Sequence, residues 1–228
     1  MNIAIILAGG TGNRLGYNIP KQFIEMAGKT VLEHTVDVFE KNSNIDEIAI
    51  VIHESYIYEM ERMIMNNDWK KVKKILKGGR MRFDSSLSAI HAYQQFPSCN
   101  LIFHDAVRPM VSDAILNEVV KALKDYNAVG VSVPVTDTLY QIDDSQCFIK
   151  SIPNRSFFHR AQTPQGFKAE TIIKAYQRAM KDTEFQLTDD CGVVAKYFPE
   201  EKIYLVRGEE TNRKITFKED LIYLQLQK

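Results

Sequence analysis

The sequence has no excess of charge of either sign, because 29 lysines and arginines balance 29 aspartates and glutamates over its 228 residues. A protein that binds nucleic acid or an anionic membrane through its overall field carries a net positive charge. We therefore expect neither nucleic acid nor a membrane as a partner, and any phosphate group must be bound by local side chains. The length suits one α/β domain, which we expect to cover residues 1–228.

Long apolar runs and clustered cysteines are also missing. The run at residues 3–8 is too short to cross a bilayer, and no basic segment precedes it as in a signal peptide. We therefore expect a cytoplasmic protein. The three cysteines, Cys99, Cys147 and Cys191, are odd in number and far apart, which favours free thiols over a disulfide framework or a zinc site.

Several catalytic motifs are absent as well. The chain has no Gly-x-Ser-x-Gly, His-Glu-x-x-His or Cys-x-x-Cys sequence, and its five histidines show no metal-ligand spacing. No segment repeats at the period of a solenoid, and no low-complexity linker divides the chain. These absences disfavour a hydrolase, a zinc enzyme and a repeat protein.

What the chain does contain is an alternation of short apolar runs with longer segments of helical spacing. This order predicts an α/β fold in which crossover helices join the strands of a sheet. The runs that predict buried strands occupy residues 3–8, 48–52, 101–103 and 129–133. Apolar side chains at helical spacing form one face in residues 31–39 and another in residues 115–123.

The segment 138–149 has a different pattern, in which two alternating stretches surround a polar turn. Such a pattern is typical of a β-hairpin. We expect an arm at approximately residues 138–150 that projects from the sheet.

A glycine-rich loop, residues 7–16, follows the first predicted strand. Glycines at this place let backbone N–H groups approach an anion, because no Cβ intervenes. The spacing fits neither a Walker loop nor the dinucleotide fingerprint. Arg14 and Lys21 add two cations, which suit a triphosphate that gathers negative charge as it loses pyrophosphate. The alternative is an ordinary glycine-rich turn with solvated basic residues.

Asp105 follows the predicted strand at residues 101–103 directly. Ligands of open α/β sheets bind beyond the carboxyl ends of the strands, so Asp105 is placed where a carboxylate would hold Mg²⁺ against phosphates. A structural salt bridge between Asp105 and Arg108 is the alternative.

Gly78 and Gly79 precede a segment of helical spacing that Asp84 or Ser85 can cap. The glycine pair would allow close approach of a base or a ribose. The alternative is a capped helix start without a ligand. Three later clusters pair a cation or a hydroxyl with turn residues and suit a phosphomonoester. They are residues 152–155, residues 162–165, and residues 188–190 together with 212–216.

Taken in order, these motifs resemble the family of methylerythritol-phosphate and ribitol-5-phosphate cytidylyltransferases, through nearly the whole chain. The matching motifs are LAGGTGNR at 7–14, PKQF at 20–23, GG at 78–79, HDAVRP at 104–109, DT at 137–138, Arg155, QTPQ at 162–165, TD at 188–189 and KIT at 214–216. The resemblance implies a Rossmann-like nucleotidyltransferase fold with a mostly parallel mixed sheet flanked by helices. It also implies a homodimer in which the hairpin arm embraces the partner.

The resemblance further implies that the acceptor's phosphate attacks the α-phosphorus of CTP in line, without a covalent enzyme intermediate. Arg14, Lys21 and Lys214 would stabilise the pentacoordinate phosphate, and Asp105 would work with Mg²⁺ and orient the acceptor. The implied nucleotide contacts are Leu7, Ala8, Gly9, Gly10, Thr11, Gly12, Gly78, Gly79, Ser85, Asp105 and Ala106. The implied acceptor contacts, some of them across the dimer, are Asp105, Arg108, Thr138, Arg155, Thr163, Thr188 and Lys214.

Two positions depart from the family pattern. Arg80 stands near a position where the family usually has an acidic residue, which puts a side-chain contact to the nucleotide in doubt. Arg213 replaces a usually apolar residue and adds charge next to Lys214.

Two motifs favour ribitol 5-phosphate as the acceptor. Residues 152–155 (IPNR) and 188–191 (TDDC) resemble the ribitol-phosphate branch, whereas the methylerythritol branch more often has Asp-Arg and Thr-Asp-Glu-Ala. CDP-ribitol would supply teichoic-acid or capsule-type polymers. The alternative is 2-C-methyl-D-erythritol 4-phosphate, an intermediate of isoprenoid synthesis.

The sequence leaves two other classes of function to compare. A nucleotide-binding module without turnover would lack a cation at position 14, 21 or 214, and all three cations are present. A sugar-nucleotide pyrophosphorylase that uses another triphosphate stays open, because the choice of base depends on loop backbone.

Overall fold

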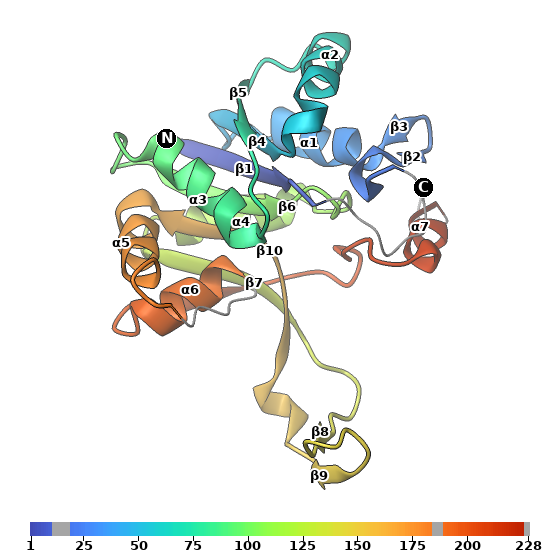
Figure 1. Cartoon of the computed structure of the whole chain (residues 1–228), viewed down its shortest axis with the longest axis vertical. Helices are drawn as coiled ribbons and strands as arrows, with labels where there is room; N and C mark the ends of the chain where they lie inside the picture. The colour runs from blue at the N-terminus through green and yellow to red at the C-terminus, as the bar shows by residue number, and fades with distance from the viewer. Residues whose placement is uncertain (11–18, 184–188, 226–228) are drawn as a thin grey trace.

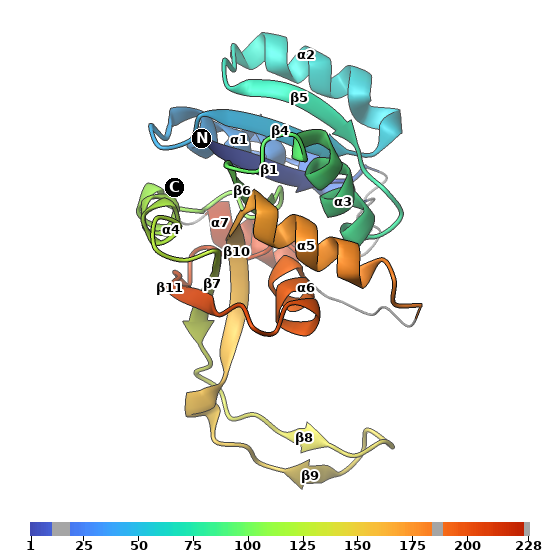
Figure 2. The ribbon, with the colours of Figure 1, turned by 90° about the vertical axis from the view of Figure 1, so that its left-hand side faces the viewer.

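The computed structural model describes residues 1–10, 19–183 and 189–225. Within these ranges a seven-stranded mixed sheet has helices on both faces, which confirms the predicted α/β class (Figures 1 and 2). The strands of this sheet, in spatial order, are β11 (Ile203–Arg207), β7 (Ala128–Pro134), β10 (His159–Lys168), β6 (Asn100–Asp105), β1 (Asn2–Ala8), β4 (Glu47–Ile52) and β5 (Val72–Lys77).

All neighbouring pairs in this sheet are parallel except those made by β10, which is antiparallel to both β6 and β7. The four strands predicted from apolar runs are confirmed as β1, β4, β6 and β7. The parallel strands β1, β4, β5 and β6 end at one edge of the sheet. Side chains that follow these four strands are therefore brought together.

The two faces of the sheet carry separate apolar cores. Alternate side chains of β1 point to opposite sides, as a strand requires. Ala4 and Ile6 belong to one core and Ile3 and Ile5 to the other. The first core contains α1 (Val31–Lys41), α2 (Ile57–Asn67) and α4 (Asp113–Ala122), and the second contains α3 (Arg82–Tyr93), α5 (Ala169–Ala179) and α6 (Asp190–Tyr197).

The predicted helical faces are confirmed in α1 and α4, whose apolar side chains at those positions are buried. Both helices begin at a side-chain cap. Thr30 and Glu33 form a capping box before α1, and Ser112 accepts a hydrogen bond from Ile115 N at the start of α4.

Short elements complete the described chain. They are η2 (Lys21–Phe23), β2 (Glu25–Met26), β3 (Lys29–Thr30), η3 (Glu54–Tyr56), β8 (Gln141–Ile142), β9 (Ile149–Ser151), η4 (Arg155–Phe157) and α7 (Lys218–Gln225). A third apolar cluster joins β2 to the segment after β6 and to α7, through Met26, Val107, Ile215 and Leu221. It places the chain around Lys214 beside the chain around Lys21.

The predicted hairpin is present between β7 and β10. Its strands β8 and β9 pair antiparallel and extend away from the sheet as an arm, here defined as residues 135–158 (Figures 1 and 2). Large apolar side chains on the arm are exposed, with Phe157 at 83% and Phe148 at 71%.

The predicted free thiols are confirmed for Cys99, Cys147 and Cys191. No helix in the part of the chain that the structure describes is long and apolar enough to span a membrane.

Candidate active site

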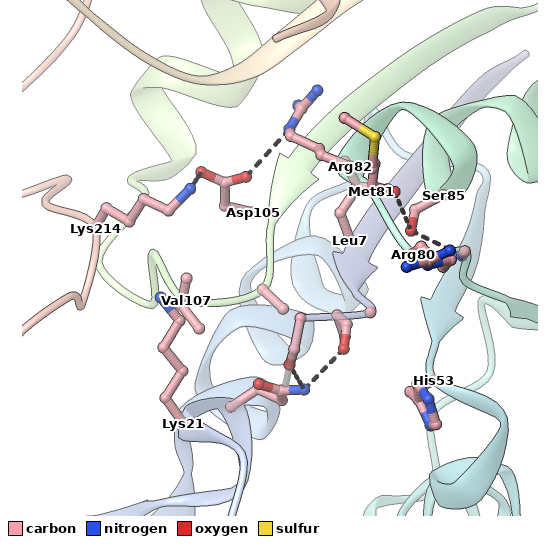
Figure 3. Close-up of a pocket in the computed structure, with 16 residues that line it drawn as sticks. Leu7, Lys21, His53, Arg80, Met81, Arg82, Ser85, Asp105, Val107 and Lys214 are labelled. Atoms are coloured by element: carbon pink, nitrogen blue, oxygen red, sulfur yellow. Dashed lines mark hydrogen bonds and ion pairs between the residues drawn. The ribbon is translucent and has the colours of Figure 1, made fainter. Parts of the chain in front are cut away.

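A cavity of about 630 Å³ opens at the carboxyl ends of β1, β4, β5 and β6 (Figure 3). This is the edge at which ligands of open α/β sheets bind. Its lining residues are Leu7, Ala8, Gly9, Gly10, Lys21, Gln22, His53, Gly79, Arg80, Met81, Arg82, Ser85, Asp105, Ala106, Val107 and Lys214. Four residues of the candidate set, Thr11, Gly12, Arg14 and Thr188, lie outside the described residues.

The glycines of this cavity are required by close packing. A Cβ on Gly9 would lie 3.0 Å from Ser85 Oγ, and a Cβ on Gly78 would lie 3.3 Å from Gly9 Cα. A Cβ on Gly79 would overlap Asp84 Cβ at 2.1 Å. The ends of β1 and β5 and the first turn of α3 therefore meet at a spacing that side chains would prevent. Gly78 takes part in this packing without lining the cavity.

Helix α3 begins earlier than the expected cap at Asp84 or Ser85. Its first residue is Arg82, and the Asp84 carboxylate accepts a hydrogen bond from Met81 N at 2.9 Å. The Asp84 side chain, in the first turn, thus satisfies the backbone N–H of Met81, the residue before the helix. The earlier start places Arg82 on the cavity wall.

Two lysines far apart in sequence reach the cavity. Lys21, on η2, donates from Nζ to Ile215 O at 3.0 Å, and Lys214 precedes that residue. Gln22, which is buried, donates to Ala8 O at 2.8 Å and to Gly10 O at 2.9 Å. Gln22 was not singled out from the sequence, although the motif at 20–23 contains it. Its two hydrogen bonds hold the start of the glycine loop against η2.

Asp105 lies among three cations (Figure 3 shows two of them). Its Oδ2 atom is 3.0 Å from Lys214 Nζ and 3.2 Å from Arg108 Nε, and its Oδ1 atom is 3.7 Å from Arg82 Nε. Burial raises the pKa of this carboxyl, but the charges of Lys214, Arg82 and Arg108 outweigh burial and hold the pKa well below its usual range. Asp105 is therefore an anion at neutral pH.

Sequence reasoning missed Arg82 and Asp190 as site residues. Arg82 Nη2 lies 2.7 Å from Asp190 Oδ2, and Asp190 has no exposed surface. Arg82 lies in the segment after Gly79, and Asp190 lies in the cluster at 188–190. Spacing along the chain gives no sign that these two segments meet.

Arg108 and Thr163 are buried beside Asp105 and do not line the cavity. Besides its ion pair with Asp105, Arg108 donates to Asn212 O at 2.9 Å. Thr163 Oγ1 accepts a hydrogen bond from Asp105 N at 3.1 Å and lies 3.0 Å from His104 Nδ1. The salt bridge weighed as an alternative for Arg108 is thus formed. Binding of an acceptor by Arg108 and Thr163 stays a prediction.

His104 is fully buried behind Asp105, and burial lowers its pKa to about 4 from a usual 6.5. As the pH falls, His104 is therefore protonated at a higher pH in the unfolded chain than in the folded chain. The resulting stability is complete above pH 6.5 and is lost as the pH falls toward 4. We expect His104→Gln to flatten the pH dependence of the unfolding free energy in this window by up to roughly 3 kcal/mol. Urea unfolding at several pH values measures this pH dependence of the unfolding free energy.

The exposed His91 supplies the control for this prediction. His91→Gln should leave the pH dependence as it is in the unaltered protein. Equal slopes for His104→Gln and the unaltered protein would show that His104 is not the titrating group.

Thr138 and Arg155 lie on the arm and do not line the cavity of their own chain. The Arg155 guanidinium donates to Thr136 O within the arm, and both residues are exposed. Binding of an acceptor by Thr138 and Arg155 stays a prediction.

The donor set around Asp105 fits a divalent cation held between the protein and phosphates. No group of three metal-binding side chains occurs among the described residues. Mg²⁺, however, is commonly bound by one or two carboxylates together with substrate phosphates. Asp105 Oδ1, with Arg82 beyond hydrogen-bond distance at 3.7 Å, is the oxygen that is free to serve.

A model of the family "IspD: 2-C-methyl-D-erythritol 4-phosphate cytidylyltransferase" matches residues 2–226. The bifunctional ribulose 5-phosphate reductase/CDP-ribitol pyrophosphorylase Bcs1 of Haemophilus influenzae is 44% identical over 221 residues, which are 96% of this chain and 46% of that protein. The chain thus spans about half the length of Bcs1. The 2-C-methyl-D-erythritol 4-phosphate cytidylyltransferase of Thermobifida fusca is 40% identical over 222 residues, covering 96% of this chain and 89% of that enzyme.

The chain is also similar to solved structures of enzymes from this family. The 4-diphosphocytidyl-2C-methyl-D-erythritol synthase of Anaerococcus prevotii superposes with a TM-score of 0.86 at 30% identity, covering 100% of this chain and 99% of the other. The 2-C-methyl-D-erythritol 4-phosphate cytidylyltransferase of Francisella tularensis gives a TM-score of 0.81 at 25% identity, covering 100% and 99%. The chain therefore belongs to the IspD family of cytidylyltransferases and is a CTP-dependent nucleotidyltransferase.

Proposed function

We propose that this protein transfers the cytidylyl group of CTP to D-ribitol 5-phosphate and so forms CDP-ribitol and diphosphate. The observation that carries the proposal is the convergence of Lys21, Lys214 and Asp105 on one cavity of a size that suits a nucleotide. The choice of ribitol 5-phosphate is supported by the motifs at 152–155 and 188–191 and by the 44% identity to Bcs1, whose name includes CDP-ribitol pyrophosphorylase.

In the proposed reaction a phosphate oxygen of the acceptor forms a bond to the α-phosphorus of CTP. The bond from that phosphorus to the bridging oxygen breaks, and diphosphate leaves with the electron pair. Lys21 and Lys214 stabilise the negative charge that gathers on the α-phosphate oxygens. Backbone groups at Gly9, Gly10 and Gly79 approach the nucleotide without interposed side chains. No proton transfer by the protein is needed.

Asp105 would hold Mg²⁺ through Oδ1 in this proposal. The ion supplies charge neutralisation for the triphosphate. The Lys214 and Arg108 pairs on Oδ2 orient the carboxylate and keep it ionised. Because the reaction consumes CTP, we place it in the cytoplasm, where its product would enter teichoic-acid or capsule synthesis.

A second candidate acceptor is 2-C-methyl-D-erythritol 4-phosphate. The family description and the 40% identity to the Thermobifida fusca enzyme favour it. With this acceptor the product would serve isoprenoid synthesis.

A pyrophosphate-release assay that crosses the four nucleoside triphosphates with both acceptors tests base and acceptor together. We expect the highest kcat/KM with CTP and ribitol 5-phosphate, by at least about ten-fold over the other acceptor. Detection of the CDP-alcohol separates transfer from CTP hydrolysis, because both reactions can release diphosphate. A higher kcat/KM with the methylerythritol phosphate would reverse the assignment of the acceptor.

We further propose a homodimer formed through the arm. The arm exposes several large apolar side chains, among them Phe148, Ile152 and Phe157. Large exposed apolar patches are rare on monomeric proteins and often mark interaction surfaces. A partner chain would cover them and would receive Thr138 and Arg155 near its own cavity.

Phe157→Asp should therefore convert the dimer into a monomer in analytical ultracentrifugation and reduce turnover, because a charge would be buried in the interface. Tyr58→Asp is the matched control, since Tyr58 on α2 is 73% exposed and lies outside the arm. Mixed dimers of Arg155→Ala and Lys214→Ala chains should regain activity that neither variant has alone. A monomeric unaltered protein, or mixtures that stay inactive, would refute the shared site.

A further inference from the structure

Arg82 lies between two carboxylates of different accessibility. Its guanidinium is 2.7 Å from Asp190 Oδ2 and 3.7 Å from Asp105 Oδ1. Arg82 and Asp105 line the cavity, and Asp190 does not. Asp190 is completely buried, whereas the Arg82 side chain keeps 25% of its surface exposed. The cation at the wall of the cavity is therefore anchored by an acid behind that wall (Figure 3 shows Arg82 and Asp105).

The anchoring carboxylate is itself fixed. Tyr176 donates a hydrogen bond from its hydroxyl to Asp190 Oδ1 at 2.6 Å, and the Tyr176 ring stacks on Phe83 with ring centroids 4.6 Å apart. Asp190 is also the first residue of α6. Among the described residues, Oδ2 accepts no aligned hydrogen bond, so the charge of Arg82 at 2.7 Å is what balances it.

The charges explain why Arg82 stays on Asp190. A fully buried carboxylate without a cation is strongly unfavourable, because desolvation is not compensated. Asp105 already has Lys214 and Arg108 on Oδ2. The charge of Arg82 therefore stabilises the Asp190 carboxylate more than the Asp105 carboxylate. As a result, no cation in the part of the chain that the structure describes lies within 3.5 Å of Asp105 Oδ1.

We propose that Asp190 is a positioning residue that acts through Arg82. It holds the guanidinium at the cavity wall, where the guanidinium faces the substrate phosphates, and keeps it off Asp105 Oδ1. That oxygen then stays available to a divalent cation. The inference rests on the proposed metal role of Asp105 and is independent of which acceptor is used. Without the charge at Asp190, Arg82 would move onto Asp105, whose Oδ1 atom already lies 3.7 Å from Arg82 Nε.

Asp190→Asn tests this directly, because the amide oxygen still accepts from Tyr176 while the charge is removed. The probe is Mn²⁺, whose binding is measured by electron paramagnetic resonance in the presence of a CTP analogue with a methylene group between the α- and β-phosphates. We expect the Mn²⁺ dissociation constant to rise on the order of ten-fold, as for other changes behind a metal ligand. The Mg²⁺ concentration for half-maximal turnover should rise in parallel.

The variant Arg82→Gln completes a double-mutant cycle. In the Arg82→Gln background no guanidinium is present to close on Asp105, so Asp190→Asn should leave Mn²⁺ affinity unchanged. The double variant also removes both charges of the ion pair, and it keeps the test usable if Asp190→Asn alone does not fold. Tyr176→Phe is the matched control, because it removes the hydrogen bond and keeps both charges, and its Mn²⁺ affinity should match that of the unaltered protein.

Three results would overturn the proposal. The first is unchanged Mn²⁺ affinity in Asp190→Asn. The second is an equal loss of affinity whether or not Arg82 is present, which would mark a merely structural role. The third is absence of Mn²⁺ binding by the unaltered protein with the CTP analogue. Failure of the ribitol 5-phosphate assignment would leave all three measurements unaffected.

Discussion

Lys21→Ala should lower kcat by about 100- to 1,000-fold with a much smaller change in KM for CTP. The loss falls on kcat because the charge on the α-phosphate oxygens is greater in the transition state than in bound CTP. Lys21 reaches the cavity from η2 and is held by Ile215 O at 3.0 Å, so its ammonium group is preorganised. Steady-state pyrophosphate release measures both constants.

Two variants separate this effect from general changes of charge. Lys70→Ala removes a lysine whose side chain is 75% exposed and pairs with Asp68 at the surface, and it should leave kcat unchanged. Lys21→Arg keeps the charge and should recover part of the loss. Thermal unfolding of Lys21→Ala should match that of the unaltered protein. Near-normal pyrophosphate release by Lys21→Ala would remove this lysine from the mechanism.

Asp105→Asn should reduce turnover by about 1,000-fold, since loss of metal binding removes several kcal/mol of transition-state stabilisation. It should also destabilise the fold by about 3 kcal/mol, because Lys214, Arg108 and Arg82 would face one another without the buried anion. Turnover at increasing Mg²⁺ and the urea midpoint measure the two effects.

Asp182→Asn is the control for this prediction. Asp182 pairs with Lys196 at 3.0 Å, accepts a hydrogen bond from the Tyr197 hydroxyl at 2.6 Å and does not line the cavity. Its replacement should change the urea midpoint slightly and turnover not at all. If Asp105→Asn kept full turnover at ordinary Mg²⁺, the proposed metal ligand would have to be another residue.

The central part of the fold could be predicted because its strands are buried on both faces. Buried parallel strands are continuous apolar runs, which is how β1, β4, β6 and β7 stand out in the sequence. The edge strand β5 (VKKILK) is half polar, and β11 is largely exposed. Strand β10 contains Pro164 and a register shift between Gln162 and Gly166. None of these three has an apolar pattern that marks it as a strand.

The candidate site could be predicted where strand ends carry its residues. Asp105 follows from the rule that ligands bind beyond the carboxyl ends of strands, and Gly9 and Gly10 follow from the glycine-rich loop after the first strand. Leu7 and Ala8 are implied by the family resemblance, and the structure places all five at the cavity.

Arg82, Asp190 and Gln22 could not be predicted in this way, because their roles depend on contacts across long sequence separations. The Arg82 to Asp190 ion pair, for example, joins the first turns of α3 and α6. Single-sequence spacing contains no information on how two helices on the same face of a sheet are rotated toward each other.

The continuity of β10 limits how the length of this protein can vary in evolution. The strand runs from the base of the arm at His159 to Thr163, whose hydroxyl fixes the backbone of Asp105 at 3.1 Å. A one-residue insertion between these points would rotate every following side chain to the opposite face of the sheet. Homologues with longer or shorter arms should therefore gain or lose residues within 135–158 and keep the four-residue distance from His159 to Thr163.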